Sequence, residues 1–91
     1  MAIPDEVASW MLRMLETSEH GELDQQTAAY GIKDRFGEEF VYVNENGNLA
    51  IDRRVLRSFR MLTEDTVVFE RYYQVWRKRT PDDDPSRRHV D

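Results

Sequence analysis

The chain has 91 residues, no cysteine and a formal net charge of −5. This length predicts one domain, since domains run from about 50 to 250 residues, and the lack of cysteine excludes disulfides and thiolate metal sites. No uncharged stretch approaches the roughly 20 apolar residues of a membrane span, and residues 1–8 do not resemble a secretory signal. We therefore expect a soluble, cytoplasmic protein.

Charge is distributed unevenly along the sequence. Residues 1–51 carry three basic and ten acidic side chains and so balance at −7. Residues 52–79 carry eight basic and four acidic side chains and so balance at +4. The two parts of the chain therefore differ in sign, which the small total conceals.

The first predicted elements are a helix and an extended link. Pro4 suits the first turn of a helix. Apolar residues then recur at the spacing of one buried stripe, namely Val7, Trp10, Met11, Met14 and Leu15. This helix should fade near Ser18 and stop by Gly21, and residues 22–23 should be extended.

A second helix is predicted over residues 24–36. Asp24 is a suitable N-cap, and Ala29, Ile32 and Phe36 recur at helical spacing. Gly37 can end the helix in the left-handed conformation.

A short hairpin or structured loop is predicted between the second and third helices. Residues 40–43 are β-branched and aromatic, and they lead into Asn46-Gly47, the strongest short signal for a hairpin turn. Asn44, Asn46 and Asn48 alternate like calcium ligands, but the glycine and the bidentate glutamate of a calcium loop are not at their positions. We therefore interpret this stretch as a turn.

The C-terminal part predicts a helix, a hairpin and a tail. Asp52 can cap a third helix that ends near Glu64, and residues 66–69 and 73–78 are typical of two strands of a hairpin. Residues 80–91 hold two prolines and three consecutive aspartates, so we expect a disordered tail. Residues 1–79 then form one α+β domain of three helices with a C-terminal β-hairpin. Its predicted core comprises Val7, Trp10, Met11, Met14, Leu15, Ile32, Phe36, Val55, Leu56, Phe59, Leu62, Val67, Phe69 and Trp76.

The order of helix, short strand, helix, helix and hairpin over residues 4–79 resembles that of a winged-helix domain. The resemblance implies that the second and third helices form a helix-turn-helix and that the hairpin is the wing, an arrangement used in DNA binding. The insertion at residues 40–48 departs from the pattern because it lengthens the turn between these helices. Separately, the stretch FVYVNENGNLAIDRRVLRSFRMLTEDTVVFE, followed by a strand containing Trp76, is similar to a family of short bacterial proteins of unknown function.

The third helix carries the arrangement that we interpret as functional. At about 100° per residue, Arg53, Arg57 and Arg60 project opposite the apolar face, and Arg54 lies to one side. Charged helix faces usually mix signs, but here only Arg60 has an acidic residue, Glu64, four positions on. Guanidinium groups suit phosphates, guanine edges or carboxylates.

These arginines suggest a nucleic-acid interface. The hairpin adds basic residues near its tip and at its exit, which completes a predicted interface of Arg53, Arg54, Arg57, Arg60, Arg71, Arg77 and Lys78. The acidic residues 1–51 would oppose binding unless they face away from the polyanion. The alternative is a protein-interaction module, an adaptor or a self-associating protein, that uses its acidic and basic faces. A third interpretation is a charged face that is merely solvated.

No catalytic, cofactor or metal motif is recognisable. His20 and His89 are the only histidines, and neither has an acidic residue at the spacing of a zinc site. The serines lack the context of an activated nucleophile, and the adjacent Glu38 and Glu39 would diverge. We therefore expect a non-enzymatic protein without a cofactor or a small-molecule substrate.

Overall fold

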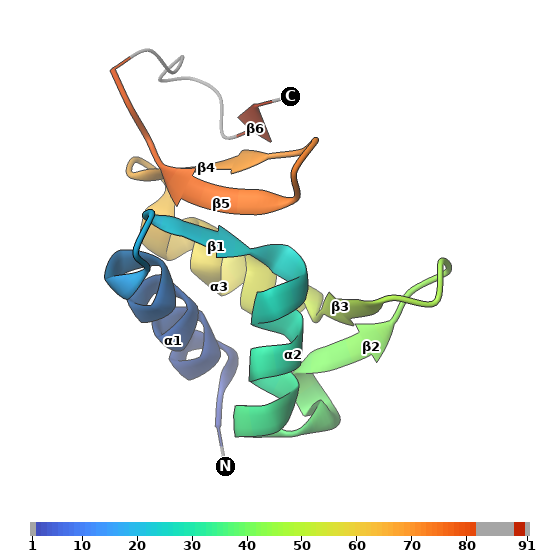
Figure 1. Cartoon of the computed structure of the whole chain (residues 1–91). Coiled ribbons are helices and arrows are strands. Elements are labelled where there is room, and N and C mark those ends of the chain that lie inside the picture. Colours follow the sequence, from blue (N-terminus) through green and yellow to red (C-terminus); the bar gives the residue numbers. More distant parts are fainter. Residues whose placement is uncertain (1, 82–88, 91) are drawn as a thin grey trace.

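The computed structural model describes residues 2–81 and 89–90. Three helices and two hairpins confirm the α+β class and the insertion between the second and third helices (Figure 1). In chain order the elements are α1 (Pro4–Thr17), β1 (Glu22–Asp24), α2 (Gln25–Phe36), the 3-10 helix η1 (Glu38–Phe40), β2 (Val41–Val43), β3 (Leu49–Ile51), α3 (Arg53–Thr63), β4 (Val67–Glu70), β5 (Val75–Lys78) and β6 (His89–Val90).

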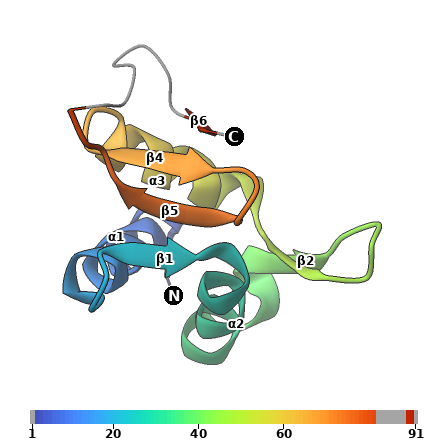
Figure 2. The ribbon, with the colours of Figure 1, turned by 45° about the horizontal axis from the view of Figure 1, so that its top comes forward.

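The main sheet has the strand order β1-β5-β4-β6, and β2 and β3 pair separately. Both neighbours of β5 are antiparallel to it, so Trp76 lies between Leu23 of β1 and Phe69 of β4. Figure 2 shows β4 and β5 lying over α3, with β1 beside them. The β2–β3 hairpin projects sideways beyond α2 (Figure 1).

Most of the tail that we predict to be disordered cannot be compared with the structure, because residues 82–88 and 91 lie outside the described residues. His89 and Val90 form β6, which pairs in parallel with Phe69 and Glu70 of β4. The outer edge of β4 offers main-chain groups that a further strand can bond, so these two residues are extended where we predicted no regular structure.

The helix ends follow local sequence signals. The Asp24 side chain accepts a hydrogen bond from the Thr27 N–H at 3.0 Å at the start of α2. Asp52 accepts one from the Arg54 N–H at 2.7 Å at the start of α3, and Gly37, with φ of 88°, ends α2. Both predicted caps are confirmed. Gly37 ends the helix where predicted, but its ψ of −173° places it outside the left-handed helical region. Within the described residues, no helix is long and apolar enough to cross a membrane.

The asparagines that resemble calcium ligands build the β2–β3 turn. The Asn44 side-chain oxygen accepts hydrogen bonds from the N–H groups of Asn46 and Asn48, both at 3.0 Å. Gly47 adopts the left-handed conformation with φ of 79°. This confirms the turn predicted at Asn46-Gly47.

The β4–β5 turn lies later in the sequence than predicted. Glu70 is opposite Val75, so residues 71–74 form the turn, and Tyr73 is in the turn instead of in the second strand. Gln74 closes the turn with φ of 56°. Its side-chain amide donates a hydrogen bond to the Arg71 carbonyl oxygen at 2.8 Å.

The core lies between the helices and the main sheet. The prediction that Met14 and Leu62 belong to the core is wrong, since their side chains are 39% and 48% exposed. On α3 the buried stripe passes through Thr63 instead of Leu62. The Thr63 hydroxyl donates to the Phe59 carbonyl oxygen at 2.7 Å, which satisfies a polar group that is otherwise costly to bury. The core members that the prediction missed are Ala8, Leu23, Ala28, Ala29, Phe40 and Ile51.

Trp76 connects the sheet to α3. Its ring lies edge-on to Phe59, with centroids 5.2 Å apart, and is tilted against Phe69 at 5.1 Å. Phe59 is 2% exposed. These three rings therefore hold the C-terminal hairpin on the helix.

Phe59→Ala should reduce the free energy of unfolding by about 3 to 5 kcal/mol, because it deletes a buried ring and leaves a cavity against Trp76. A loss of that size threatens a domain this small. Urea melts measure it, with Met61→Ala as a control expected within about 0.5 kcal/mol because Met61 is 73% exposed on the same helix. A Phe59→Ala loss below about 1 kcal/mol would show that the ring is not structural.

Gly31→Ala should destabilise the protein, although alanine usually favours a helix over glycine by about 1 kcal/mol. An added Cβ at Gly31 would lie 2.5 Å from Cη2 of Trp10, whose ring packs edge-on against Phe36 with centroids 5.9 Å apart. The indole must then move, so tryptophan emission should shift together with a lower urea midpoint. Lys33→Ala, at an exposed position of the same helix, is the control. A Gly31→Ala protein more stable than the parent would contradict this packing.

Candidate nucleic-acid interface

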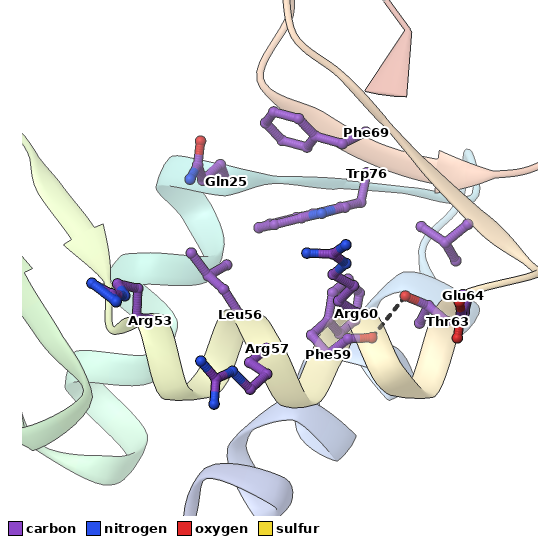
Figure 3. A pocket seen from close by; sticks show the side chains of 11 residues that line it. Gln25, Arg53, Leu56, Arg57, Phe59, Arg60, Thr63, Glu64, Phe69 and Trp76 are labelled. Carbon is purple, nitrogen blue, oxygen red and sulfur yellow. Dashed lines mark hydrogen bonds between the residues drawn. The ribbon is translucent and has the colours of Figure 1, made fainter. Parts of the chain in front are cut away.

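A groove of about 420 Å³ lies between α3 and the strands β4 and β5 (Figure 3). We call it the α3 groove. Its apolar lining consists of Leu56, Phe59, Val67, Phe69 and Trp76, and its polar lining consists of Gln25, Arg53, Arg57, Arg60, Thr63 and Glu64. The groove therefore combines an apolar floor with a rim that is mainly basic.

Three of the predicted interface arginines come together on this rim. Arg53, Arg57 and Arg60 are all exposed, and their spacing of four and three residues places them on one side of α3. In Figure 3, Arg60 extends toward the Trp76 ring, whereas the guanidinium groups of Arg53 and Arg57 turn away from it.

The rim carries a positive charge. Three guanidinium groups and the single carboxylate of Glu64 leave a balance of +2 among the residues that line the groove. Within the described part of the chain, neither Arg53, Arg57 nor Arg60 forms an ion pair. Like charges at this spacing repel one another on an isolated helix, so an anion bound between them would relieve that repulsion.

Arg54 lies outside the α3 groove. Its Nε donates to the Asp52 carboxylate at 3.0 Å, and its guanidinium carbon lies 5.6 Å from the centre of the Phe40 ring. The side-chain hydrogen bond from Arg54 lowers the pKa of Asp52 below its ordinary value of 3.8. The same bond raises the pKa of Arg54. Arg54 is therefore engaged in fixing the start of α3.

The basic residues of the hairpin separate into two kinds. Arg77 is half-buried and forms an ion pair with Glu70 across the hairpin, and it also donates to the Lys78 carbonyl oxygen at 3.1 Å. Arg71 and Lys78 are exposed. Of the three hairpin residues in the predicted interface, Arg71 and Lys78 thus present their charges to solvent more fully than Arg77.

The apolar floor of the groove was not part of the predicted interface. Phe69 and Trp76 were predicted as core, and Gln25 had no predicted role. In the sequence they are apolar or neutral residues within predicted elements. Such a pattern does not distinguish residues of a groove floor from residues of the core. The floor arises because β4 and β5 dock on α3, which only the tertiary structure reveals.

A second hollow, of about 380 Å³, lies between α1 and α2. Its charged lining has two carboxylates, Asp5 and Glu6, and two guanidinium groups, Arg13 and Arg35. Asp5 also accepts a hydrogen bond from the Ser58 hydroxyl at 2.6 Å. Equal numbers of opposite charges favour no ionic ligand. Among the described residues, no group of three His, Asp or Glu side chains is placed to hold a metal ion.

The fold and the groove define a small α+β domain with a basic groove that has an aromatic floor. Residues 3–78 match the family described as "Family of unknown function (DUF6953)", and the chain belongs to that family. Neither the curated proteins nor the solved structures yield a match. Membership of a family without an assigned function is confirmed, whereas a bacterial origin and a winged-helix arrangement stay predictions.

Asp52→Ala should lower the free energy of unfolding by about 1 kcal/mol, because it removes the N-cap of α3. The pH dependence of stability distinguishes the contribution of the N-cap hydrogen bond from that of the Asp52–Arg54 ion pair. A lowered folded-state pKa stabilises the protein above the unfolded pKa, and this contribution is lost as the pH falls through the folded value. The stability difference between the parent and Asp52→Asn, which keeps a capping oxygen, should shrink between about pH 7 and about pH 3 in urea melts. A constant difference would contradict a charged Asp52–Arg54 pair.

Proposed function

We propose that the protein is a non-enzymatic, cytoplasmic nucleic-acid-binding module whose α3 groove receives the phosphate backbone. The observation that carries this proposal is the row of Arg53, Arg57 and Arg60, three exposed guanidinium groups on one rim without an ion pair in the described part of the chain. Guanidinium is the side-chain group best suited to bind phosphate oxygens in pairs.

The arrangement around α3 supports a winged-helix interpretation of this surface. α3 follows α2 and precedes the β4–β5 hairpin, and β5 lies between β1 and β4 in the sheet. In helix-turn-helix proteins the second helix of the pair presents its side chains to nucleic acid. The insertion of residues 40–48 does not obstruct it, since none of these residues is among those lining the α3 groove.

The predicted interface residues receive different roles in this proposal. Arg53, Arg57 and Arg60 bind phosphates along the rim of the groove, and Arg71 and Lys78 extend the basic surface along the hairpin. The guanidinium groups of Arg54 and Arg77 hold Asp52 and Glu70, so these two arginines contribute mainly by positioning α3 and the hairpin.

The acidic N-terminal half contributes no carboxylate to the described lining of the groove. Among the described residues that line the groove, Gln25 alone comes from residues 1–51, and its side chain is uncharged. Screening in about 0.15 M salt reduces interactions between exposed charges beyond about 8 Å. The local charge of the rim therefore outweighs the net charge of −5.

Replacing Arg53, Arg57 and Arg60 together by alanine should abolish most of the affinity for oligonucleotides. In an anisotropy titration at about 50 mM salt, the parent should bind in the micromolar range. The slope of log affinity against log salt should lose about 2 to 3 units in the variant, because three phosphate contacts are removed.

A second triple variant, with Arg13, Lys33 and Arg35 replaced by alanine, is the matched control. It removes the same charge from exposed positions on α1 and α2 and should keep the parent affinity. If both variants weaken the affinity equally, binding depends on overall charge, and α3 is not the element that binds the nucleic acid.

The apolar floor of the groove favours a second candidate, an acidic protein segment with an apolar side chain. The same titration distinguishes the two, with polyglutamate as the competitor. If only a large excess of polyglutamate displaces the oligonucleotide, the result supports nucleic acid as the ligand. If the protein binds polyglutamate but not the oligonucleotide, the result supports the protein-binding alternative. Light scattering at low and high salt then tests whether the acidic and basic faces pair between copies.

A further inference from the structure

We propose that Tyr72 and Tyr73, at the tip of the β4–β5 hairpin, stack on unpaired bases and that the ligand of this protein is a single-stranded nucleic acid. The inference rests on the proposed function, because the α3 groove supplies the phosphate contacts. The two tyrosines add a second element to the interface, and this element makes the protein prefer unpaired over paired bases.

The two rings are exposed to an extent that packing does not explain. Tyr72 is 81% and Tyr73 66% exposed, and their rings meet edge to face with centroids 4.9 Å apart. Aromatic rings carry large apolar surfaces that usually contribute to cores or interfaces. Neither tyrosine belongs to the core cluster formed by the described residues, so their apolar faces are available to a ligand.

The turn that carries the rings is held in place by three interactions. Gln74 donates to the Arg71 carbonyl oxygen at 2.8 Å, and the Gln25 N–H donates to the Gln74 carbonyl oxygen at 2.9 Å. The Arg77–Glu70 ion pair braces the hairpin directly behind the turn. A preorganised platform loses little conformational entropy when a ligand binds.

Gln25 places this platform at one end of the α3 groove. Its main chain bonds the hairpin turn, and its side chain lines the groove together with that of Arg53. A strand whose phosphates lie along Arg60, Arg57 and Arg53 therefore runs toward the hairpin turn that carries the tyrosines. Arg71 lies in the same turn and adds an exposed positive charge to it.

Two rings presented in this way favour single strands over duplexes. In a duplex the faces of the bases are covered by their neighbours, whereas in a single strand they are open to aromatic side chains. Combining a basic groove with exposed aromatic rings is the usual means by which proteins bind single strands without sequence preference.

The test compares ligands of equal charge with and without bases. A labelled oligothymidylate of about 12 nucleotides, an abasic strand of the same length and a duplex are titrated at about 50 mM salt. The parent should bind oligothymidylate at least about fivefold more tightly than the abasic strand, since stacking contributes about 1 to 3 kcal/mol per base. It should also prefer oligothymidylate to the duplex.

The double variant Tyr72→Ala, Tyr73→Ala should bind both single strands equally, at the parent's affinity for the abasic strand. The double variant Tyr72→Phe, Tyr73→Phe should retain the preference, because stacking needs the ring and not the hydroxyl. The matched control replaces Tyr30 on α2 and Tyr42 on β2 by alanine. These tyrosines are 55% and 53% exposed, and the control should bind all strands as the parent does. Thermal melts of all variants should agree with that of the parent because these rings lie outside the core.

The outcomes separate the two claims. If no oligonucleotide binds, or if the triple arginine variant binds as the parent does, the proposed function fails. If binding depends on the arginines but is equal for abasic and thymidylate strands, stronger for the duplex, or unchanged by Tyr72→Ala, Tyr73→Ala, the proposed function stands and the stacking platform is overturned. Loss of the preference in the phenylalanine variant would assign the effect to the hydroxyls and would likewise overturn stacking.

Discussion

The packing of Trp76 against Phe59 is the contact on which the rest of the structure depends. The strands of the main sheet have only two to four residues each, and a short isolated hairpin is marginal in water. Trp76 stands in the middle of that sheet, opposite Leu23 and Phe69, and reaches the ring of Phe59 on α3. This contact gives the sheet a hydrophobic partner and fixes the distance between β5 and the helix.

The same contact creates the candidate site. Because Trp76 and Phe69 dock on α3 from one side, the arginines on the neighbouring side of the helix become the rim of a groove with an aromatic floor. α3 thus buries Val55 and Phe59 on one face and holds like charges on another. A helix that served stability alone would gain from alternating signs there. The cost of the arginine row is therefore an argument for a ligand.

Sequence reasoning located features that depend on near neighbours. The caps at Asp24 and Asp52 and the turn at Gly47 were predictable because each is decided within a few residues. Periodicity alone could not choose between Leu62 and Thr63, since adjacent positions differ by only about 100° around a helix. Phe40 became core because the insertion folds back on the helices, a contact that no local pattern encodes.

The candidate site was predictable in composition but not in shape. The spacing of Arg53, Arg57 and Arg60 indicated one basic face, and the structure keeps these three together on the groove rim. The pairing of Arg54 with Asp52 competes with its predicted role, although the cap that causes it was itself expected. The four-residue turn depends on the register of β4 with β5. The exposure of Tyr73 therefore could not be inferred from the strand-like residues that follow it.

Separation of charge along the chain gives the proposed interface a direction. A protein of net charge −5 is repelled by a polyanion at long range. Attraction arises only where the local field is positive, at the α3 groove and along the exposed side of the hairpin. In the proposed complex, acidic residues that lie away from this surface would disfavour other approaches to the ligand, whereas Glu22 and Asp24 of β1 flank β5 itself. In the proposed complex, acidic residues away from the groove would contribute orientation, and the arginines on its rim would contribute affinity.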